Sequence, residues 1–129
     1  FSMKIFNILN EKKVEINNSK ILILGITFKE NCPDTRNSKV VDLFKELKTF
    51  RSNVDIYDPI VNVKEFKNEY GIDILYIPPK KYYDIVVITV GHQIFTDLGE
   101  KEIRKWCKPG GIIMDLKNTI SKDEVDFTL

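Results

Sequence analysis

Apolar residues form strand-like runs at four places along the chain. Ile21–Leu24 is a continuous aliphatic run, which is typical of a parallel strand covered on both faces. NVDIYDP alternates polar and apolar residues and stops at a proline, and YDIVVITV and IIMDL are two further apolar runs. The pattern therefore predicts four strands, and YDIVVITV is the strongest candidate for the centre of a sheet.

Other segments carry apolar residues at helical spacing. Residues 3–12 have the pattern of an amphipathic helix. A second helical period begins at Lys39, where Asn37 or Ser38 would serve as the N-cap. The two asparagines at positions 17 and 18 are typical of a linker between the first helix and the first strand.

The second half of the chain predicts shorter helices. Val63–Tyr70 has helical spacing and Gly71 would end it. Ile72–Ile77 does not distinguish between strand, helix and loop. Glu100–Cys107 predicts a short helix closed by KPGG, and the final SKDEVDFTL has the serine and glutamate spacing of a capped helix.

The alternation of strands and helices predicts the fold class. It favours right-handed βαβ units, and therefore a Rossmann-like α/β fold, a three-layer sandwich with a mainly parallel sheet. A chain of 129 residues is long enough to bury one hydrophobic core. Phe1 is an unusual first residue and the last helical pattern stops early, so we expect a fragment of a larger protein.

The overall charge excludes several kinds of partner. Twenty basic and nineteen acidic residues give a net charge of +1, which does not favour a nucleic-acid-binding or membrane-surface protein.

The apolar runs are too short to span a bilayer, and the start lacks the pattern of a signal peptide. Two cysteines without metal-type spacing predict a reduced, cytoplasmic protein, although a bridge between Cys32 and Cys107 stays open.

The candidate chemistry lies after the predicted strands. Ligands of open α/β sheets bind beyond the carboxyl ends of the strands. Three segments would meet there: Gly25–Ser38, Thr89–Thr96 and Asp115–Thr119. Their basic or titratable side chains, together with the start of a helix, suit a phosphate or pyrophosphate. These side chains are Lys29, Arg36, His92 and Lys117.

Less specific interpretations of the same residues stay open. Asp34 and Arg36 could pair with each other and do no more than tie the loop down. His92, the single histidine, would be a hydrogen-bonding loop residue more readily than a catalyst. Phe28 could pack beneath the loop rather than face a ligand. Cys32 would be a loop-packing thiol rather than a nucleophile, because no base adjoins it in the sequence.

Four motifs, in order, resemble one protein family. GITFKENCPDTRNS is similar to the G-x-x-F-K and D-x-R-x-S signature of the C-terminal domain of the UDP-glucose/GDP-mannose dehydrogenase family. NVDIYDP resembles the family's second strand, and YDIVVITVGHQIF and IIMDLKN resemble its last two strands with their ligand-facing ends. The resemblance covers residues 20–129. It is strongest to the members that oxidise UDP-N-acetylhexosamines for surface polysaccharides.

The resemblance implies a larger enzyme around this chain. Such an enzyme binds NAD on an N-terminal Rossmann domain and carries a catalytic cysteine on a central helical domain, which forms a homodimer or higher assembly. It oxidises the C6 alcohol of a nucleotide sugar in two steps through a thioester. Residues 1–18 would then be the tail of the helical domain and a linker, and residues 19–129 the nucleotide-sugar-binding domain. Neither Cys32 nor Cys107 matches the catalytic cysteine, so the chain alone should be inactive.

The resemblance also assigns roles to single residues. Phe28 and Lys29 match the pair that contacts the UDP-sugar substrate, and Arg36 matches the arginine that reaches NAD. Lys117 stands where many relatives have an arginine that faces the substrate, and a lysine cannot form the same two-pronged contact. Apart from the resemblance, the single histidine and the spacing of the two cysteines predict no metal site.

Two other classes of function compete with this interpretation. A phospho-acceptor signalling domain of flavodoxin-like fold would need an acidic pair after the first strand, where the chain reads Gly25, Ile26 and Thr27. A non-catalytic, nucleotide-binding regulatory module of Rossmann-like fold is the other alternative. The chain lacks both the G-x-G-x-x-G and the G-K-[ST] motif, so neither a standard dinucleotide site nor a P-loop is predicted.

Overall fold

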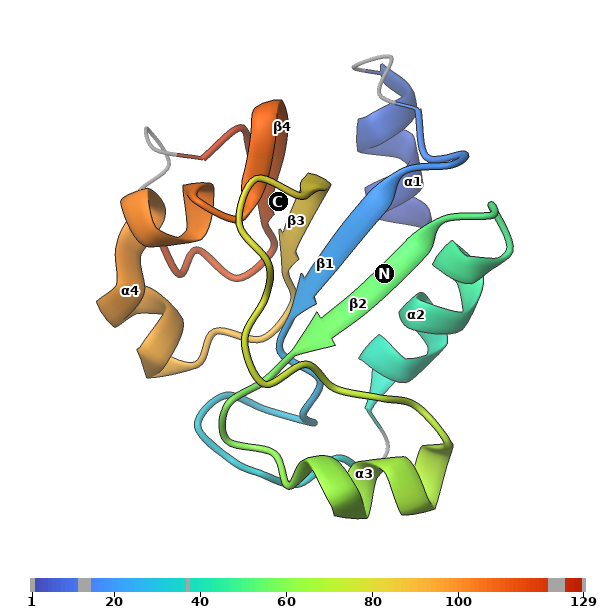
Figure 1. Ribbon diagram of the computed structural model, residues 1–129, viewed down its shortest axis with the longest axis vertical. Helices are drawn as coiled ribbons and strands as arrows, with labels where there is room; N and C mark the ends of the chain where they lie inside the picture. Colours follow the sequence, from blue (N-terminus) through green and yellow to red (C-terminus); the bar gives the residue numbers. More distant parts are fainter. Residues whose placement is uncertain (1, 12–14, 37, 121–124, 129) are drawn as a thin grey trace.

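A five-stranded parallel sheet forms the centre of the molecule, in the strand order β2-β1-β3-β4-β5 (Figure 1). The computed structural model describes residues 2–11, 15–36, 38–120 and 125–128. The strands are β1 (Lys20–Leu24), β2 (Asn53–Tyr57), β3 (Tyr83–Ile88), β4 (Cys107–Asp115) and β5 (Phe127–Thr128). The four strands predicted from the hydrophobic pattern are confirmed, and β5 is an addition to them.

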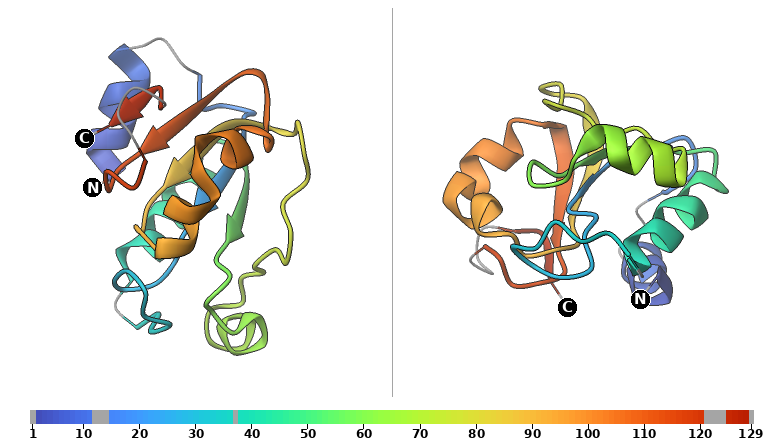
Figure 2. Two further views of the ribbon diagram at one scale, coloured as in Figure 1. Left: turned by 90° about the vertical axis from the view of Figure 1, so that its left-hand side faces the viewer. Right: turned by 90° about the horizontal axis from the view of Figure 1, so that it is seen from below.

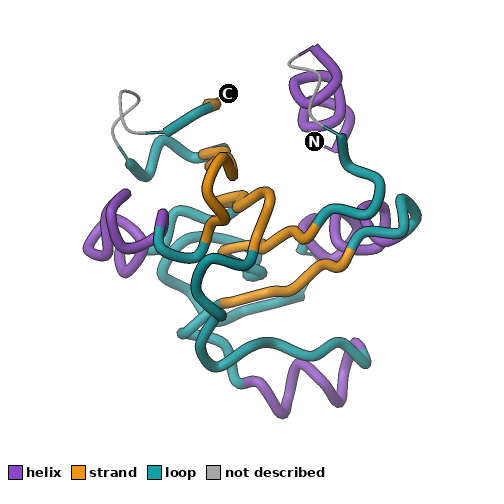
Figure 3. The backbone as a smooth tube through the Cα atoms, turned by 45° about the horizontal axis from the view of Figure 1, so that its top comes forward, coloured by secondary structure: helices purple, strands orange, loops and turns teal. Residues whose placement is uncertain are grey.

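Helices cover both faces of this sheet, so the predicted three-layer, Rossmann-like α/β fold is confirmed (Figures 1 and 3). The helices are α1 (Ser2–Glu11), α2 (Lys39–Lys48), α3 (Val63–Tyr70) and α4 (Gln93–Arg104). Figure 1 shows α4 on one side of the sheet and α1 and α2 on the other. Among the described residues, no helix is long and apolar enough to cross a membrane.

The buried strands feed two separate clusters of apolar side chains. Successive side chains of a strand point to opposite faces, so Ile21 and Ile23 of β1 lie in the cluster beneath α1 and α2. Leu22 and Leu24 lie in the other cluster, with Phe95 and Ile103 of α4. A strand that is apolar at every position is thereby buried on both faces.

Local capping signals set the boundaries of two helices as predicted. The Ser38 hydroxyl accepts a hydrogen bond from the Val40 N–H and donates one to the Ile26 carbonyl oxygen, so this N-cap also ties α2 to the end of β1. Helix α3 ends at Gly71, whose φ of 70° is the left-handed conformation that glycine adopts most readily.

The predicted helix over Glu100–Cys107 is wrong at both ends. Helix α4 begins at Gln93 and passes a kink at Gly99, and Cys107 already belongs to β4. The N–H groups of Tyr82 and Tyr83 both donate to the Trp106 carbonyl. Pairing with β3 therefore replaces the helix at this point of the chain. The KPGG turn lies within β4, at a register shift opposite β3.

Two further expectations concern segments with weak patterns. Ile72–Ile77 forms no strand; Leu75 makes a single bridge to Tyr57. The start of the helix expected from SKDEVDFTL, residues 121–124, lies outside the described residues. Its end is not helical, because Phe127 and Thr128 pair with Met114 and Asp115 as β5. A segment of two residues is too short to carry a helical pattern, so no helical signal competes with its pairing to β4.

Both cysteines are free thiols. The alternative of a Cys32–Cys107 bridge is therefore wrong: Cys32 is half-exposed on the loop after β1, and Cys107 is buried at the start of β4. Burial raises the pKa of the Cys107 thiol to about 11.

Candidate functional site

Loops that follow β1, β3 and β4 enclose a cleft of about 660 Å³ at the carboxyl edge of the sheet. The right-hand view of Figure 2, seen from below, shows the long loop after β1 in front of the carboxyl ends of the strands. The cleft is lined by Thr27, Phe28, Lys29, Glu30, Lys39, Val40, Thr89, Val90, Gly91 and Lys117. The predicted meeting of three strand ends is confirmed.

The charge in this cleft favours an anionic ligand. Lys29, Lys39 and Lys117 line it together with one carboxylate, that of Glu30. Lys39 and Val40 are the first two residues of α2, so the positive end of the helix dipole also borders the cleft. The structure thus brings Lys29 and Lys117 to one cavity although 87 residues separate them in the chain.

Phe28 lies on the surface of the loop rather than beneath it. Its side chain is among the exposed large apolar groups, at 60% exposure, and it lines the cleft. The alternative that Phe28 packs under the loop is therefore wrong. An exposed aromatic ring beside lysine side chains offers an apolar face to a flat ligand group.

Arg36 lies outside the lining of the cleft. Its guanidinium donates two hydrogen bonds to Asp34, from Nε to Oδ1 at 3.0 Å and from an Nη to Oδ2 at 2.9 Å. These hydrogen bonds lower the pKa of the Asp34 carboxyl to about 2. The predicted Asp34–Arg36 pair is confirmed, but the Arg36 side chain is 79% exposed, so the pair is a surface contact that stabilises little.

A buried aspartate holds the loop that carries Lys117. Asp115 ends β4 and is fully buried. Its Oδ1 accepts from the Lys117 N–H at 3.1 Å and its Oδ2 accepts from the Ile120 N–H at 2.8 Å. The sequence interpretation missed this role, although the position of an aspartate directly after an apolar strand signals an acceptor for the following turn.

A second buried aspartate, Asp58, has the same role at the end of β2. Its Oδ2 accepts from the Ile26 N–H at 2.8 Å and lies 2.9 Å from Nε2 of His92. His92 is buried, at 1% exposure, and its Nδ1 accepts from the Asn31 N–H at 2.9 Å. His92 is therefore the hydrogen-bonding loop residue that the sequence favoured; Asp58 was missed, since only the fold brings the two together.

Close approach of the loops leaves little room for a side chain at Gly91. A Cβ atom there would lie 3.2 Å from both Glu30 Oε2 and Thr119 Oγ1. Among the described residues, Thr119 Oγ1 is a buried hydroxyl oxygen without a hydrogen-bond partner. The backbone of Gly91 and an unpaired hydroxyl oxygen therefore lie near the wall of the cleft, in addition to the charged side chains that line it.

Gly25 does not provide the close approach that a dinucleotide needs. Its φ is +100°, and a Cβ atom on it would lie 2.6 Å from the Val90 Cβ. The space beside this glycine is thus filled by a core side chain. Glycines of a dinucleotide-binding turn leave that space to a pyrophosphate, so the residues after β1 do not fit NAD in the usual way.

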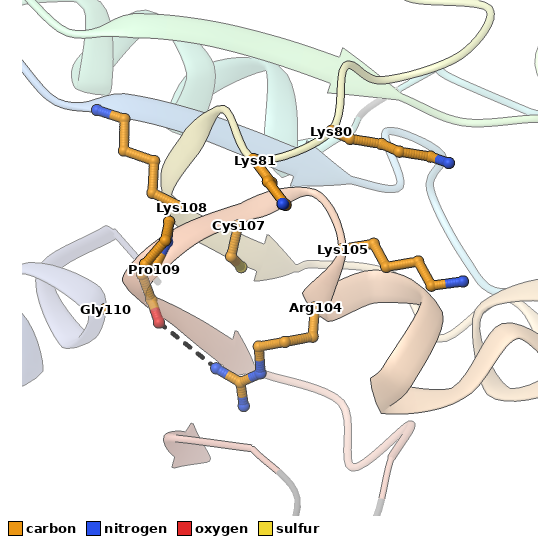
Figure 4. A pocket seen from close by; sticks show the side chains of 9 residues that line it. Lys80, Lys81, Arg104, Lys105, Cys107, Lys108, Pro109 and Gly110 are labelled. Carbon is orange, nitrogen blue, oxygen red and sulfur yellow. Dashed lines mark hydrogen bonds between the residues drawn. The ribbon is translucent and has the colours of Figure 1, made fainter.

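A second cleft, of about 620 Å³, lies at the opposite edge of the sheet (Figure 4). Five cations line it: Lys80, Lys81, Arg104, Lys105 and Lys108. They do not converge, because Figure 4 shows the Lys108 side chain pointing away from Lys80 and Lys105. Lys105 also pairs with Glu102 and Lys108 with Asp84, so this cleft lacks the common focus of a built anion site.

Comparisons with known proteins show the family to which the chain belongs. The sequence profile described as "UDP-glucose/GDP-mannose dehydrogenase family, UDP binding domain" matches residues 22–122. UDP-N-acetyl-D-glucosamine 6-dehydrogenase of Salmonella typhi is 38% identical over 99% of this chain, and the enzyme of the same name from Pseudomonas aeruginosa is 37% identical over 92%. The chain spans 30% and 28% of the length of these two proteins.

Solved structures have the same fold. An NDP-N-acetyl-D-galactosaminuronic acid dehydrogenase from Methanosarcina mazei superposes on 95% of this chain with a TM-score of 0.77, at 22% identity and over 26% of its own length. A UDP-D-ManNAc dehydrogenase from Pyrococcus horikoshii superposes on 96% of the chain with a TM-score of 0.72, at 22% identity and over 28% of its own length.

Proposed function

Because this chain belongs to the UDP-glucose/GDP-mannose dehydrogenase family, as a UDP-binding domain, we propose that the cleft at the carboxyl edge of its sheet binds the UDP half of a nucleotide sugar. One observation carries the proposal. Phe28, Lys29 and Lys117, which the sequence motifs assign to the substrate, come from two distant strand ends and line one cavity.

Each of these residues has a role that suits a UDP-sugar. The ammonium groups of Lys29 and Lys117 neutralise the diphosphate, and the N-terminus of α2 adds its dipole. Phe28 supplies an apolar face. Lys117 acts as a point charge, without the two-pronged geometry that an arginine would impose on the diphosphate.

The parent protein is, in this proposal, a cytoplasmic, NAD-dependent nucleotide-sugar 6-dehydrogenase of surface polysaccharide biosynthesis, assembled as a homodimer or a higher oligomer. Residues 19–129 form its nucleotide-sugar-binding domain, and residues 1–18 are the tail of a preceding helical domain with a linker. The identity of 38% and 37% to two UDP-N-acetyl-D-glucosamine 6-dehydrogenases supports a UDP-N-acetylhexosamine as the substrate.

The catalytic cysteine of this parent lies outside the chain. Cys107 is buried at the edge opposite the proposed substrate cleft, and Cys32 is absent from the lining of that cleft. NAD, when bound, accepts hydride from the sugar, and it is held mainly by another domain. Arg36 reaches toward it from the exposed face of the loop, where its side chain is 79% accessible.

A Lys29→Ala variant of the full-length parent tests the proposal. A lost charge-assisted contact costs about 1.5–3 kcal/mol, so we expect kcat/KM for the UDP-sugar to fall by about 10- to 150-fold. Lys45→Ala, on the exposed side of α2, is the matched control and should leave kcat/KM unchanged. Unchanged kinetics of Lys29→Ala would contradict the assignment.

Titration of this chain with UDP, followed by amide NMR, gives a direct test of the site. We expect shifts clustered on Phe28, Lys29 and Lys117, with millimolar or weaker affinity because other domains complete the substrate site. Shifts clustered instead at Lys80 and Lys81 would move the nucleotide to the opposite edge and overturn the proposal.

A further inference from the structure

We propose that His92, held as its neutral Nε2–H tautomer, is a positioning residue that fixes the loop over residues 27–31 and thereby sets Phe28 and Lys29 over the cleft. The ligand in this inference is that of the proposed function. The part that concerns the tautomer and the loop depends only on the hydrogen bonds described below.

The two partners of the imidazole define its tautomer. The Asn31 N–H lies 2.9 Å from His92 Nδ1, and a backbone N–H is only a donor, so Nδ1 carries a lone pair. Nε2 lies 2.9 Å from Oδ2 of Asp58, and a carboxylate oxygen is an acceptor, so Nε2 carries the proton. Both roles are filled only by the neutral Nε2–H ring.

The surroundings of the ring leave little freedom for another arrangement. His92 is 1% exposed and the Asp58 side chain is completely buried. The Thr27 hydroxyl oxygen is 3.3 Å from Nε2, and the Phe95 ring of α4 lies 5.6 Å from the imidazole, centroid to centroid. Among the described groups that contact the ring, Asp58 is the titratable one. A charged ring would turn an Nδ1–H group toward the Asn31 N–H.

Asn31 is held a second time, by the residue that follows His92. Its Oδ1 accepts from the N–H of Gln93, the first residue of α4, at 2.7 Å. Its backbone has a φ of 57°, a conformation that asparagine tolerates better than most residues. The start of α4 therefore holds the far end of the loop through both the backbone and the side chain of Asn31.

The near end of the loop is held by the same buried group. Asp58 Oδ2 accepts from the Ile26 N–H at 2.8 Å, and the Thr27 hydroxyl donates to the Lys29 carbonyl at 2.8 Å. Phe28 and Lys29 are thus exposed on a loop whose two ends are tied to one buried network. His92 does not line the cleft, so it acts on the ligand through the loop and not by contact.

The ring-nitrogen spectrum of this chain tests the tautomer. Nitrogen-15 spectra near pH 7 should show a lone-pair signal for Nδ1, a protonated signal for Nε2, and a coupling from Nδ1 to the Asn31 amide. A ring protonated at Nδ1, whether neutral or charged, would overturn the inference.

Two variants of similar size separate the two hydrogen bonds. In His92→Asn the side-chain oxygen takes the place of Nδ1, whereas in His92→Gln the amide nitrogen takes the place of Nε2. We expect His92→Asn to keep the amide positions of residues 27–31 and to bind UDP within about threefold of the wild type. His92→Gln should shift these amides and weaken UDP binding about tenfold or more.

Ile103→Val is the control for general loss of packing. This side chain is fully buried in the apolar cluster beneath α4 and is not among the groups that contact the imidazole. The variant should lower the melting temperature and leave UDP affinity unchanged. A His92→Gln variant with wild-type loop amides and wild-type UDP affinity would overturn the positioning role.

These measurements also separate the inference from the proposed function. If the wild type does not bind UDP, the proposed function of the cleft fails in this chain, while the ring nitrogens and the loop amides of the same spectra still decide the role of His92. If His92→Gln does not fold, the tautomer and the His92→Asn variant decide it.

Discussion

At the scale of single residues, buried carboxylates hold the loops that line the cleft. Asp58 follows β2 and Asp115 is the last residue of β4. Both are almost or completely buried and accept backbone N–H groups of the loops that line the cleft. A carboxylate has enough acceptor positions to satisfy several donors at once. Buried carboxylates therefore position the loops that carry the solvent-exposed lysines.

Removal of the Asp115 carboxylate tests this principle. Asp115→Ala leaves the N–H groups of Lys117 and Ile120 without their acceptor, so we expect a loss of about 2–4 kcal/mol in the free energy of unfolding. Asp115→Asn retains one acceptor oxygen and should lose about half as much. Urea denaturation measures both, and equal stability of Asp115→Ala and the wild type would contradict the role.

The two thiols should differ in reactivity with pH. Burial raises the pKa of Cys107 from 9.0 to about 11, so the thiolate fraction at pH 8 is about a hundredfold smaller than for an ordinary thiol. A raised pKa stabilises the folded protein below about pH 9, and this contribution is lost as the pH rises toward 11.

Alkylation at pH 8, followed by mass spectrometry of the peptides, checks this difference. Cys32 should be modified first in the folded protein, and both thiols at similar rates in urea. Equal rates in the folded protein would show that Cys107 is not protected.

At the scale of elements, side-chain hydrogen bonds join the strands and helices to their neighbours. The Ser38 cap joins the start of α2 to the end of β1, and Tyr70 of α3 donates to the Thr35 carbonyl at 2.8 Å. At the other end of the sheet, the Tyr83 hydroxyl donates to Asp55 Oδ2 at 2.6 Å, across β1. The Ser38 and Tyr70 contacts hold the loop after β1 from both α2 and α3.

Gly25 tests how closely two elements must approach. A Cβ atom at this φ of +100° would lie 2.6 Å from the Val90 Cβ, so we expect Gly25→Ala to cost about 3 kcal/mol or more. Gly110→Ala is the matched control, because its φ is +83° and no atom lies within 4 Å, and it should cost about 1–2 kcal/mol. Equal losses of stability in urea denaturation would mean that backbone conformation alone, and not the approach of Val90, requires glycine at position 25.

At the scale of the whole molecule, the two edges of the sheet differ in how their charged side chains are arranged. Both carry lysines, but the carboxyl edge joins them to a helix N-terminus and to three strand ends in one cleft. At the amino edge the Lys108 side chain points away from Lys80 and Lys105, and both Lys105 and Lys108 are paired with carboxylates. Net charge alone would not tell these edges apart.

A pair of double variants checks that difference. Lys29→Gln with Lys117→Gln should weaken UDP binding about tenfold or more, and the remaining binding should depend less on salt. Lys80→Gln with Lys81→Gln removes the same charge from the opposite edge and should change the affinity less than about twofold. Calorimetry at low and moderate ionic strength measures both, and equal effects would mean that only net charge matters.

Local signals in the amino-acid sequence were sufficient to predict most of the helices and strands. Apolar runs and helical periods lie within single segments, so four strands and the boundaries of α3 followed from the pattern. Gly71 was recognised as a cap, and the cap of α2 was narrowed to Asn37 or Ser38, because a cap acts on its own helix. The predicted end of the helix before Cys107 was wrong because pairing with a distant strand overrode the local signal.

The contacts that hold the site together depend on the folding of distant segments against one another. Asp58 and His92 are 34 residues apart, and Asn31 and His92 are 61 apart, so no local pattern could pair them. Motifs had assigned Lys29 and Lys117 to one ligand, but the fold alone placed them on one cleft and left Arg36 outside its lining. The physical reason is that a parallel sheet brings its carboxyl ends to one edge, where buried acceptors and close backbone contacts set the loops.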